Sequence, residues 1–167
     1  MRHHPEAIGL ELDNSGWVEI ATLVSKGEKA GFKISESIIR HVVTISDKQR
    51  FKISDDGLRI RANQGHSVRV DLGLQAIEPP EFLYHGTAQH NLASICREGI
   101  KRSNRNHVHL SAERETAVKV SARHGQAVVL IVMAAKMSKD GKQFFSSENG
   151  VWLTEFVAPE YLERSKP

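Results

Sequence analysis

The densest cluster of reactive side chains in the sequence is RANQGHS, at residues 61–67. It combines an arginine, a histidine, two amides and a serine, and Ala62 is its only apolar residue. Arginine and histidine side chains bind phosphates and stabilise developing negative charge. By residue type alone, the cluster fits either one wall of an anion-binding site or a polar turn that ends a strand.

Other polar motifs contribute the same residue types. They are MRHHPE (1–6), LYHGT (83–87), RNHVHLS (105–111), SARHG (121–125) and ENGVWL (148–153). Each motif alone is a weak signal: a histidine such as His85 usually ends a strand, Arg123 is typical of a helix C-terminus, and Trp152 suits a core. Together they supply arginines and histidines with few carboxylates, which is the composition of a phosphate-binding site.

Several standard sites are missing from the sequence. It contains no Walker loop, GxGxxG, CxxC or HExxH motif. His107 and His109 would share one face of a strand, but no companion ligand has a suitable spacing, so we expect no metal. The single cysteine excludes an internal disulfide. Cys96 is spaced like a core residue with Leu92 and Ile95, and we expect it in the core rather than as a nucleophile.

Basic residues are concentrated in the first half of the chain. The net charge is only +3, but residues 38–70 contain Arg40, Lys48, Arg50, Lys52, Arg59, Arg61 and Arg69 against Asp47, Asp55 and Asp56. This excess suits a polyanion such as nucleic acid. The alternative is an ordinary solvated surface; the number of arginines, which contact phosphate in a bidentate manner, favours the polyanion.

In chain order, the motifs RHHPE, GLELDNSGW, SDKQRF, IRANQGHS, PPEFLYHGT, HVHLS, ARHG and ENGVWLT resemble the RNA 2′-phosphotransferase family. This family is an NAD-dependent branch of the ADP-ribosyltransferase-like enzymes, and the resemblance spans nearly the whole chain. It implies removal of an internal RNA 2′-phosphate, as at a tRNA splice junction, through an ADP-ribosylated RNA phosphate and transesterification. The implied products are 2′-OH RNA, nicotinamide and ADP-ribose 1″,2″-cyclic phosphate, with NAD as co-substrate and no metal.

The resemblance also assigns residues. The implied catalytic set is Arg2, His3, Arg61 and Arg123. The implied contacts to the substrate phosphate are Gln64, His66 and Ser67. The implied NAD-binding residues are Tyr84, His85, Gly86, Thr87, His109, Leu110, Ser111 and Val151. By this resemblance, RANQGHS is a wall of the site.

Two features of this assignment have physical consequences. Val151 occupies a position where transferases that modify amino acid side chains often have a glutamate; a phosphate dianion is itself a nucleophile and needs no general base. Family members usually have a helix that leads into the Arg-His motif, whereas Arg2 is the second residue here. We therefore expect either a start further upstream or a missing helix, and fraying at Arg2.

Two other functions fit the same residues. One is ADP-ribosylation of a nucleic-acid end or a protein, which would use the same NAD pocket and stop after the first transfer. The other is a winged-helix DNA-binding protein with a degenerate second lobe. The HGT, HVHLS and ARHG motifs argue against the latter, because a degenerate pocket need not keep them.

The elements that must position these residues indicate an α+β fold of two lobes, joined by a proline-containing connector at 77–82. Residues 1–76 predict a winged-helix-like, RNA-binding lobe. Helices are expected at 18–30 and 35–46, the second capped by Ser35 and with Ile38, Ile39, Val42 and Val43 on one face. Strands at 50–54 and 58–62 flank Asp55-Asp56-Gly57, which is a hairpin signal. A further strand is expected at 67–74.

Residues 77–167 predict an ADP-ribosyltransferase-like, NAD-binding lobe. Strands are expected at 82–86, 107–111, 127–135, 144–147 and 151–157, and helices at 88–99 and 111–125. The apolar run at 127–135 is too short to span a membrane, and the first residues lack the hydrophobic segment of a secretory signal. We therefore expect a cytoplasmic, monomeric protein.

Overall fold

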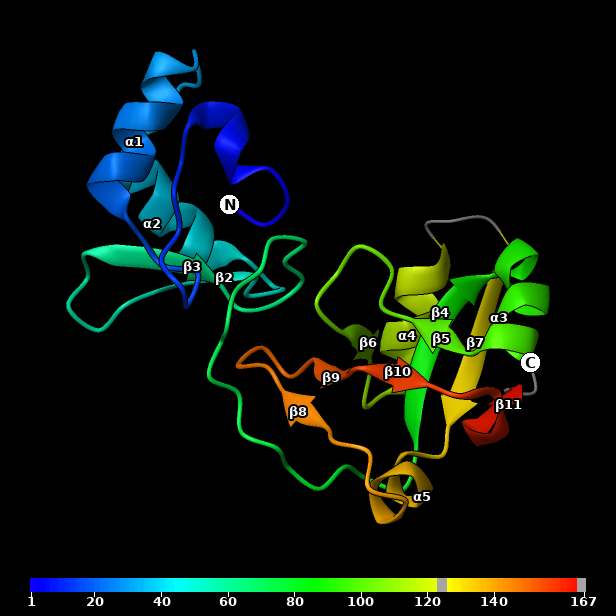
Figure 1. The fold of residues 1–167 in the computed structure, drawn as a ribbon. Coiled ribbons are helices and arrows are strands. Elements are labelled where there is room, and N and C mark those ends of the chain that lie inside the picture. Colours follow the sequence, from blue (N-terminus) through cyan, green and yellow to red (C-terminus); the bar gives the residue numbers. More distant parts are fainter. Residues whose placement is uncertain (123–125, 165–167) are drawn as a thin grey trace. The chain divides into compact units, whose positions relative to one another are not determined.

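The computed structural model describes residues 1–122 and 126–164. The chain forms two compact units, Met1–Gly73 and Leu74–Pro167. Both contain helices and short strands, as the ribbon in Figure 1 shows, so the α+β class is confirmed. The backbone of Ile77 donates to the carbonyl of Phe144 at 2.9 Å, so the predicted connector begins as part of the second unit.

The first unit combines two α-helices with a three-stranded antiparallel sheet of order β1-β3-β2. Its elements are η1 (Pro5–Ile8), β1 (Val18–Glu19), α1 (Ile20–Lys29), α2 (Glu36–Ile45), β2 (Phe51–Ile53) and β3 (Arg59–Ala62). Both predicted helices and the hairpin are confirmed. The first two residues of the helix predicted at 18–30 form strand β1 instead. The Ser35 hydroxyl accepts a hydrogen bond from the Ile38 amide at 3.3 Å, which confirms the cap.

The core of the first unit corrects the predicted face of α2. The buried residues are Leu10, Val18, Ile20, Leu23, Ile39 and Ile60. Within α2, Ile39 is buried and Val43 packs against this core, whereas Ile38 and Val42 are exposed. The helix therefore contacts the sheet through a narrower stripe than its apolar residues suggested.

The predicted strand at 67–74 is wrong. The segment has no strand, because its backbone groups bond to loops instead: the Ser67 amide donates to Arg2 at 3.0 Å and the Asp71 amide donates to Asn14 at 2.8 Å. Gly73 has a φ of 64°, which a regular strand does not adopt. The alternation of apolar and polar residues at 67–74 therefore occurs in an irregular segment, which is hydrogen-bonded to the N-terminal part of the chain.

The second unit contains two three-stranded sheets, of order β11-β7-β4 and β6-β9-β8, and the pair β10-β5. Its elements are β4 (Leu83–Ala88), η2 (Gln89–Asn91), α3 (Leu92–Glu98), β5 (Ile100–Lys101), β6 (Val108–Leu110), α4 (Arg114–Ser121), β7 (Ala127–Val132), α5 (Ala134–Lys139), β8 (Phe145–Ser146), β9 (Trp152–Thr154), β10 (Phe156–Val157), η4 (Pro159–Tyr161) and β11 (Leu162–Arg164).

The central strand of this unit is β7, which pairs with both β4 and β11 (Figure 1). Its apolar run was predicted as one strand, but the strand ends at Val132 and Ala134 begins α5. The strand predicted at 151–157 is also divided, because β9 pairs with β6 and β8 whereas β10 pairs with β5. Helix α4 packs against β4 and β7.

Cys96 was predicted in the core, and this is wrong, because its side chain is exposed. In α3 it is Ile95 that is buried, with Leu92 packed against the same core. Successive residues of a helix point about 100° apart, so the residue after Ile95 faces outward. Trp152 is partly buried and packs against the core.

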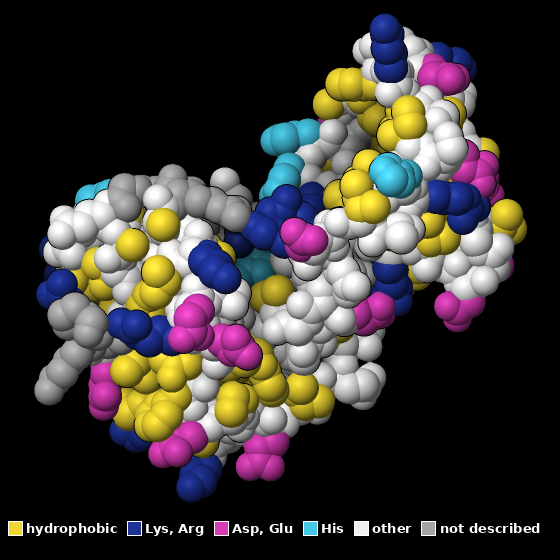
Figure 2. All heavy atoms as spheres, turned by 180° about the vertical axis from the view of Figure 1, so that it is seen from behind, with side chains coloured by type: hydrophobic (Ala, Val, Ile, Leu, Met, Phe, Trp, Pro, Cys, Tyr) yellow, Lys and Arg dark blue, Asp and Glu magenta, His cyan; other side chains and the backbone are white. Residues whose placement is uncertain are grey.

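The surface carries scattered hydrophobic residues. On the face drawn in Figure 2, hydrophobic side chains form small clusters separated by charged ones, which is common in globular proteins. Within the described residues, no helix has the length and hydrophobicity needed to cross a membrane.

Gly86 of β4 generates a stability prediction. A Cβ at this position would overlap the backbone carbonyl of Ala117 in α4. We expect Gly86→Ala to lower the free energy of unfolding by about 1–3 kcal/mol, as overpacking does. Ala93→Ser also adds one heavy atom, at an exposed position of α3, and should cost less than about 0.5 kcal/mol. Urea unfolding of both variants measures the difference; equal costs would contradict the close packing of α4 on β4.

Candidate functional site

The first group of site residues forms where the start of the chain meets the 65–67 loop. The Ser67 amide donates to the Arg2 carbonyl at 3.0 Å, and the Arg2 guanidinium donates to the Gly65 carbonyl at 3.4 Å. The His3 Nδ1 and the Ser67 Oγ are 3.1 Å apart. Three residues assigned from the resemblance, Arg2, His3 and Ser67, therefore lie side by side, and Arg2 is half-buried.

Gly65 is required by this arrangement. Its φ is 79°, a conformation that glycine adopts readily. A Cβ at this position would overlap the guanidinium of Arg2. The absent side chain therefore leaves the space in which Arg2 lies against the loop.

His66 is a buried histidine surrounded by positive charge. It is 2% exposed, and burial, followed by the charges of Arg2, the N-terminal ammonium, Arg61 and His3, lowers its pKa from 6.5 to about 4. Its imidazole is therefore neutral at neutral pH. Its Nε2 is buried and has no hydrogen-bond partner among the described residues, so a ligand that bonds this atom would satisfy it.

Arg61 projects from β3, on the face opposite the buried Ile60 and Ala62. Its guanidinium carbon is 4.7 Å from the centre of the Trp17 ring, which is within the range of a cation–π interaction. The Oε1 of Gln64, two residues after β3, is also buried without a hydrogen-bond partner in the described part of the chain. Two of the residues assigned to the RNA phosphate, Gln64 and His66, therefore each have a buried polar atom without a partner in the described part of the chain.

The second group of site residues joins β4 to β6. The backbones of Tyr84 and Ser111 exchange two hydrogen bonds of 2.9 Å each. This bridge sets the His85 Nδ1 at 3.1 Å from the carbonyl oxygen of His109. Four of the residues assigned to NAD thus meet at one point of the second unit.

The hydrogen bonds of the two histidines define their tautomers. Burial lowers the pKa of His85, although its bond to the His109 carbonyl opposes this; the charge of Arg105 lowers the pKa further. Neutral His85 donates through Nδ1, so its Nε2 is an acceptor. The Nδ1 of His109 lies 3.0 Å from the Arg105 guanidinium, which has only donors. His109 Nδ1 therefore accepts and its Nε2 carries the proton.

This pair has the chemistry to hold a ribose. A hydroxyl both donates and accepts hydrogen bonds, and the two histidines offer one acceptor and one donor from adjacent strands. The residues present therefore fit the sugar of a nucleotide such as NAD. They provide orientation without charge.

The remaining assigned residues have different surroundings. Thr87 is buried and its Oγ1 accepts from Asn91 at 3.3 Å. Leu110 is 2% exposed, belongs to the hydrophobic core and pairs with Trp152 of β9, so its side chain does not contact a ligand. The Val151 amide donates to Ser147 Oγ at 3.1 Å, at the end of a turn. Arg123 lies outside the described residues.

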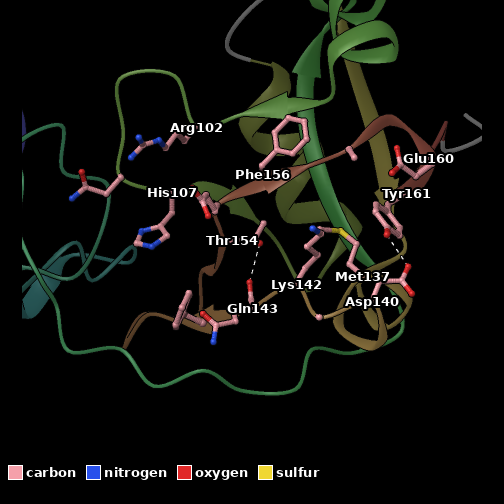
Figure 3. Close-up of a pocket in the computed structure, with 15 residues that line it drawn as sticks. Arg102, His107, Met137, Asp140, Lys142, Gln143, Thr154, Phe156, Glu160 and Tyr161 are labelled. Carbon is pink, nitrogen blue, oxygen red and sulfur yellow. Dashed lines mark hydrogen bonds between the residues drawn. The ribbon is translucent and has the colours of Figure 1, made fainter.

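A cavity of about 890 Å³ lies elsewhere in the second unit (Figure 3). Arg102 and His107 line one side, and a 2.7 Å hydrogen bond from Tyr161 to Asp140 lies on the other. None of the residues assigned to NAD lines it. Cavity size therefore does not point to the residues assigned to NAD.

Sequence reasoning missed two residues that the structure connects to the site. Trp17 contacts Arg61, and Arg105 sets the tautomer of His109. Both lie in motifs that the sequence singles out, Trp17 in GLELDNSGW and Arg105 in RNHVHLS, but neither residue was given a role. Among the described residues, no group of three or more histidine, cysteine, aspartate or glutamate side chains could hold a metal ion.

Comparison with known proteins shows which family the chain resembles. The profile of a family described as "RNA 2'-phosphotransferase, Tpt1 / KptA family" matches residues 1–156. A "Probable RNA 2'-phosphotransferase" of Acaryochloris marina is 53% identical over 97% of this chain and 90% of its own length. Proteins with the same name from Agrobacterium fabrum and Escherichia coli are 52% and 49% identical, over 97% and 98% of this chain and 87% and 89% of their own lengths.

The depressed pKa of His66 predicts a pH-dependent stability. Below pH 6.5 the unfolded chain protonates this histidine and the folded chain does not until about pH 4. Stability is thus complete above pH 6.5 and should fall by about 3 kcal/mol as the pH drops to about 4. His66→Gln, which cannot titrate, should show a correspondingly flatter dependence.

The two tryptophans allow the measurement to follow one unit. In a Trp152→Phe background, the fluorescence of Trp17 reports urea unfolding of the first unit. Every other titrating group is common to the parent and the His66→Gln variant, so the difference between their pH profiles belongs to His66. Parallel profiles would show that His66 is not a buried neutral base.

Proposed function

This chain belongs to the RNA 2′-phosphotransferase family, and we propose that it removes an internal 2′-phosphate from RNA with NAD as co-substrate. The observation that carries the proposal is the grouping of Arg2 and Arg61 around the neutral imidazole of His66. Such a group binds a dianion through charge and through hydrogen bonds at the same time.

In this proposal, the first unit is a winged-helix-like lobe that receives the RNA. Its two helices are followed by the β2–β3 hairpin, from which Arg61 projects. Arg61 and Arg2 hold the phosphate, and His3, Gln64 and Ser67 fix its orientation. His66 is neutral before the phosphate binds, so it does not add to the repulsion between the arginines.

The second unit is, in the same proposal, an ADP-ribosyltransferase-like lobe that binds NAD. NAD supplies a ribose carbon that accepts the phosphate oxygen while nicotinamide leaves. His85 and His109 hold the ribose hydroxyls through the acceptor and the donor that their partners define. Their role is to hold the sugar in one orientation.

Val151 and the arginine of the ARHG motif complete the proposal. Val151 provides no base, and none is needed when the nucleophile is a phosphate dianion. Transfer of the phosphate away from the RNA then requires a hydroxyl to attack an anionic diester. Arginines must offset that charge, and the resemblance assigns this task to Arg123.

Arg61 gives the most specific mutational test of the proposed phosphate site. Its contact should contribute about 1.5–3 kcal/mol, as charge-assisted hydrogen bonds do. Arg61→Ala should therefore slow single-turnover dephosphorylation roughly ten- to a hundredfold or more, while the affinity for NAD is retained. Arg61→Lys should recover only part of the rate, because lysine lacks the planar fork.

Equilibrium binding of NAD serves as the control for these variants. If Arg61→Ala turned over RNA at the parent rate, the 61–67 segment would be a polar turn after a strand. A loss of NAD affinity equal to the loss of rate would instead assign Arg61 to the co-substrate.

A further inference from the structure

We propose that the outer face of the first unit's sheet binds the phosphodiester backbone of the RNA on either side of the 2′-phosphate. This basic face consists of Trp17, Lys52, Arg59 and Arg61. The proposal rests on the proposed function for the identity of the substrate, and it adds a second region of contact beyond the phosphate that is removed.

Strand geometry places the four residues on one face. Side chains alternate along a strand, and in β3 Ile60 and Ala62 are buried, so Arg59 and Arg61 point the other way. The strand register sets Lys52 of β2 opposite Arg61 and Glu19 of β1 opposite Arg59.

Three cations surround the ring of Trp17, which directly precedes β1. The Lys52 ammonium is 5.4 Å from the ring centre, and the guanidinium carbons of Arg59 and Arg61 are 5.5 and 4.7 Å from it. Each distance is within the range of a cation–π interaction. Trp17 therefore gathers the three cations on this face of the sheet.

The face carries more positive than negative charge. Lys52 and Arg61 lie opposite each other in the sheet, and Glu19 lies opposite Arg59. Neighbouring cations of this kind attract a polyanion, and this is the sign of partner that the arrangement fits.

The chemistry points to a strand of phosphates rather than to a single anion. Arg59 and Arg61 are two residues apart, about 6.6 Å along β3, so they can contact different phosphates. Arg61 is also the residue proposed to hold the 2′-phosphate, so the backbone on either side of that group would pass over Lys52 and Arg59. Such contacts position a strand without discriminating between bases.

The test compares RNA of two lengths. Binding of a 12-nucleotide RNA with one internal 2′-phosphate, and of a dinucleotide with the same group, is measured at several salt concentrations without NAD. The proteins are the parent, Lys52→Ala, Arg59→Ala and the double variant. Lys29→Ala, which removes an exposed cation from the end of α1, is the control for net charge.

We expect each variant to reduce the affinity advantage of the 12-mer over the dinucleotide several-fold. The slope of log K against log salt for the 12-mer should become shallower by about 0.7 per cation removed, and the double variant should lose about twice as much. Lys29→Ala should keep the parent slope. Circular dichroism and urea unfolding verify that every variant is folded.

Slopes equal to that of the parent in both single variants would overturn the proposal, as would equal losses for the 12-mer and the dinucleotide. The proposed function fails separately: it fails if the parent with NAD leaves the 2′-phosphate on the 12-mer. Parent turnover of the 12-mer, together with unchanged binding of the 12-mer by the variants, would reject the basic face alone.

Discussion

One backbone hydrogen bond, from the Ser67 amide to the Arg2 carbonyl, brings together residues of the first unit that we propose bind the phosphate. It joins two segments that are far apart in sequence, and it sets the Arg2 guanidinium in the space that Gly65 leaves open. If this contact opened, the start of the chain would separate from the loop and His66 would gain water. The same opening would reduce the burial that is the largest cause of the low pKa of His66.

In the proposed function, the two units bind their ligands in different ways. The first gathers arginines, keeps His66 neutral by burial, and places further cations around Trp17. The second uses little charge and relies on tautomers that hydrogen-bond partners impose on His85 and His109. A dianion requires charge for binding, whereas a sugar requires donors and acceptors in fixed directions, so each unit matches the part of the reaction assigned to it.

Local sequence patterns correctly predicted the elements that are stabilised by contacts between residues close together in the sequence. The 3.6-residue period and the Ser35 cap fixed α2, and alternation around Asp55-Asp56-Gly57 fixed the hairpin. Alternation failed at 67–74, where the backbone bonds to loops, and helical spacing failed at Cys96, because the neighbouring Ile95 takes the buried position. The candidate site residues were assigned from a resemblance of motifs. Contacts such as Trp17 with Arg61 and Arg105 with His109 join residues through the folded structure, so periodicity and spacing had no means to predict them.

The central claim is that the phosphate leaves RNA by transfer to the ribose of NAD. The most direct measurement follows the phosphorus atom: a short RNA with a labelled internal 2′-phosphate is incubated with the protein, NAD and excess chelator, and the products are separated. The account predicts that the label moves to ADP-ribose 1″,2″-cyclic phosphate, with release of an equal amount of nicotinamide and of 2′-OH RNA. Label released as inorganic phosphate, or label that stays on RNA bearing a stable ADP-ribose, would contradict it.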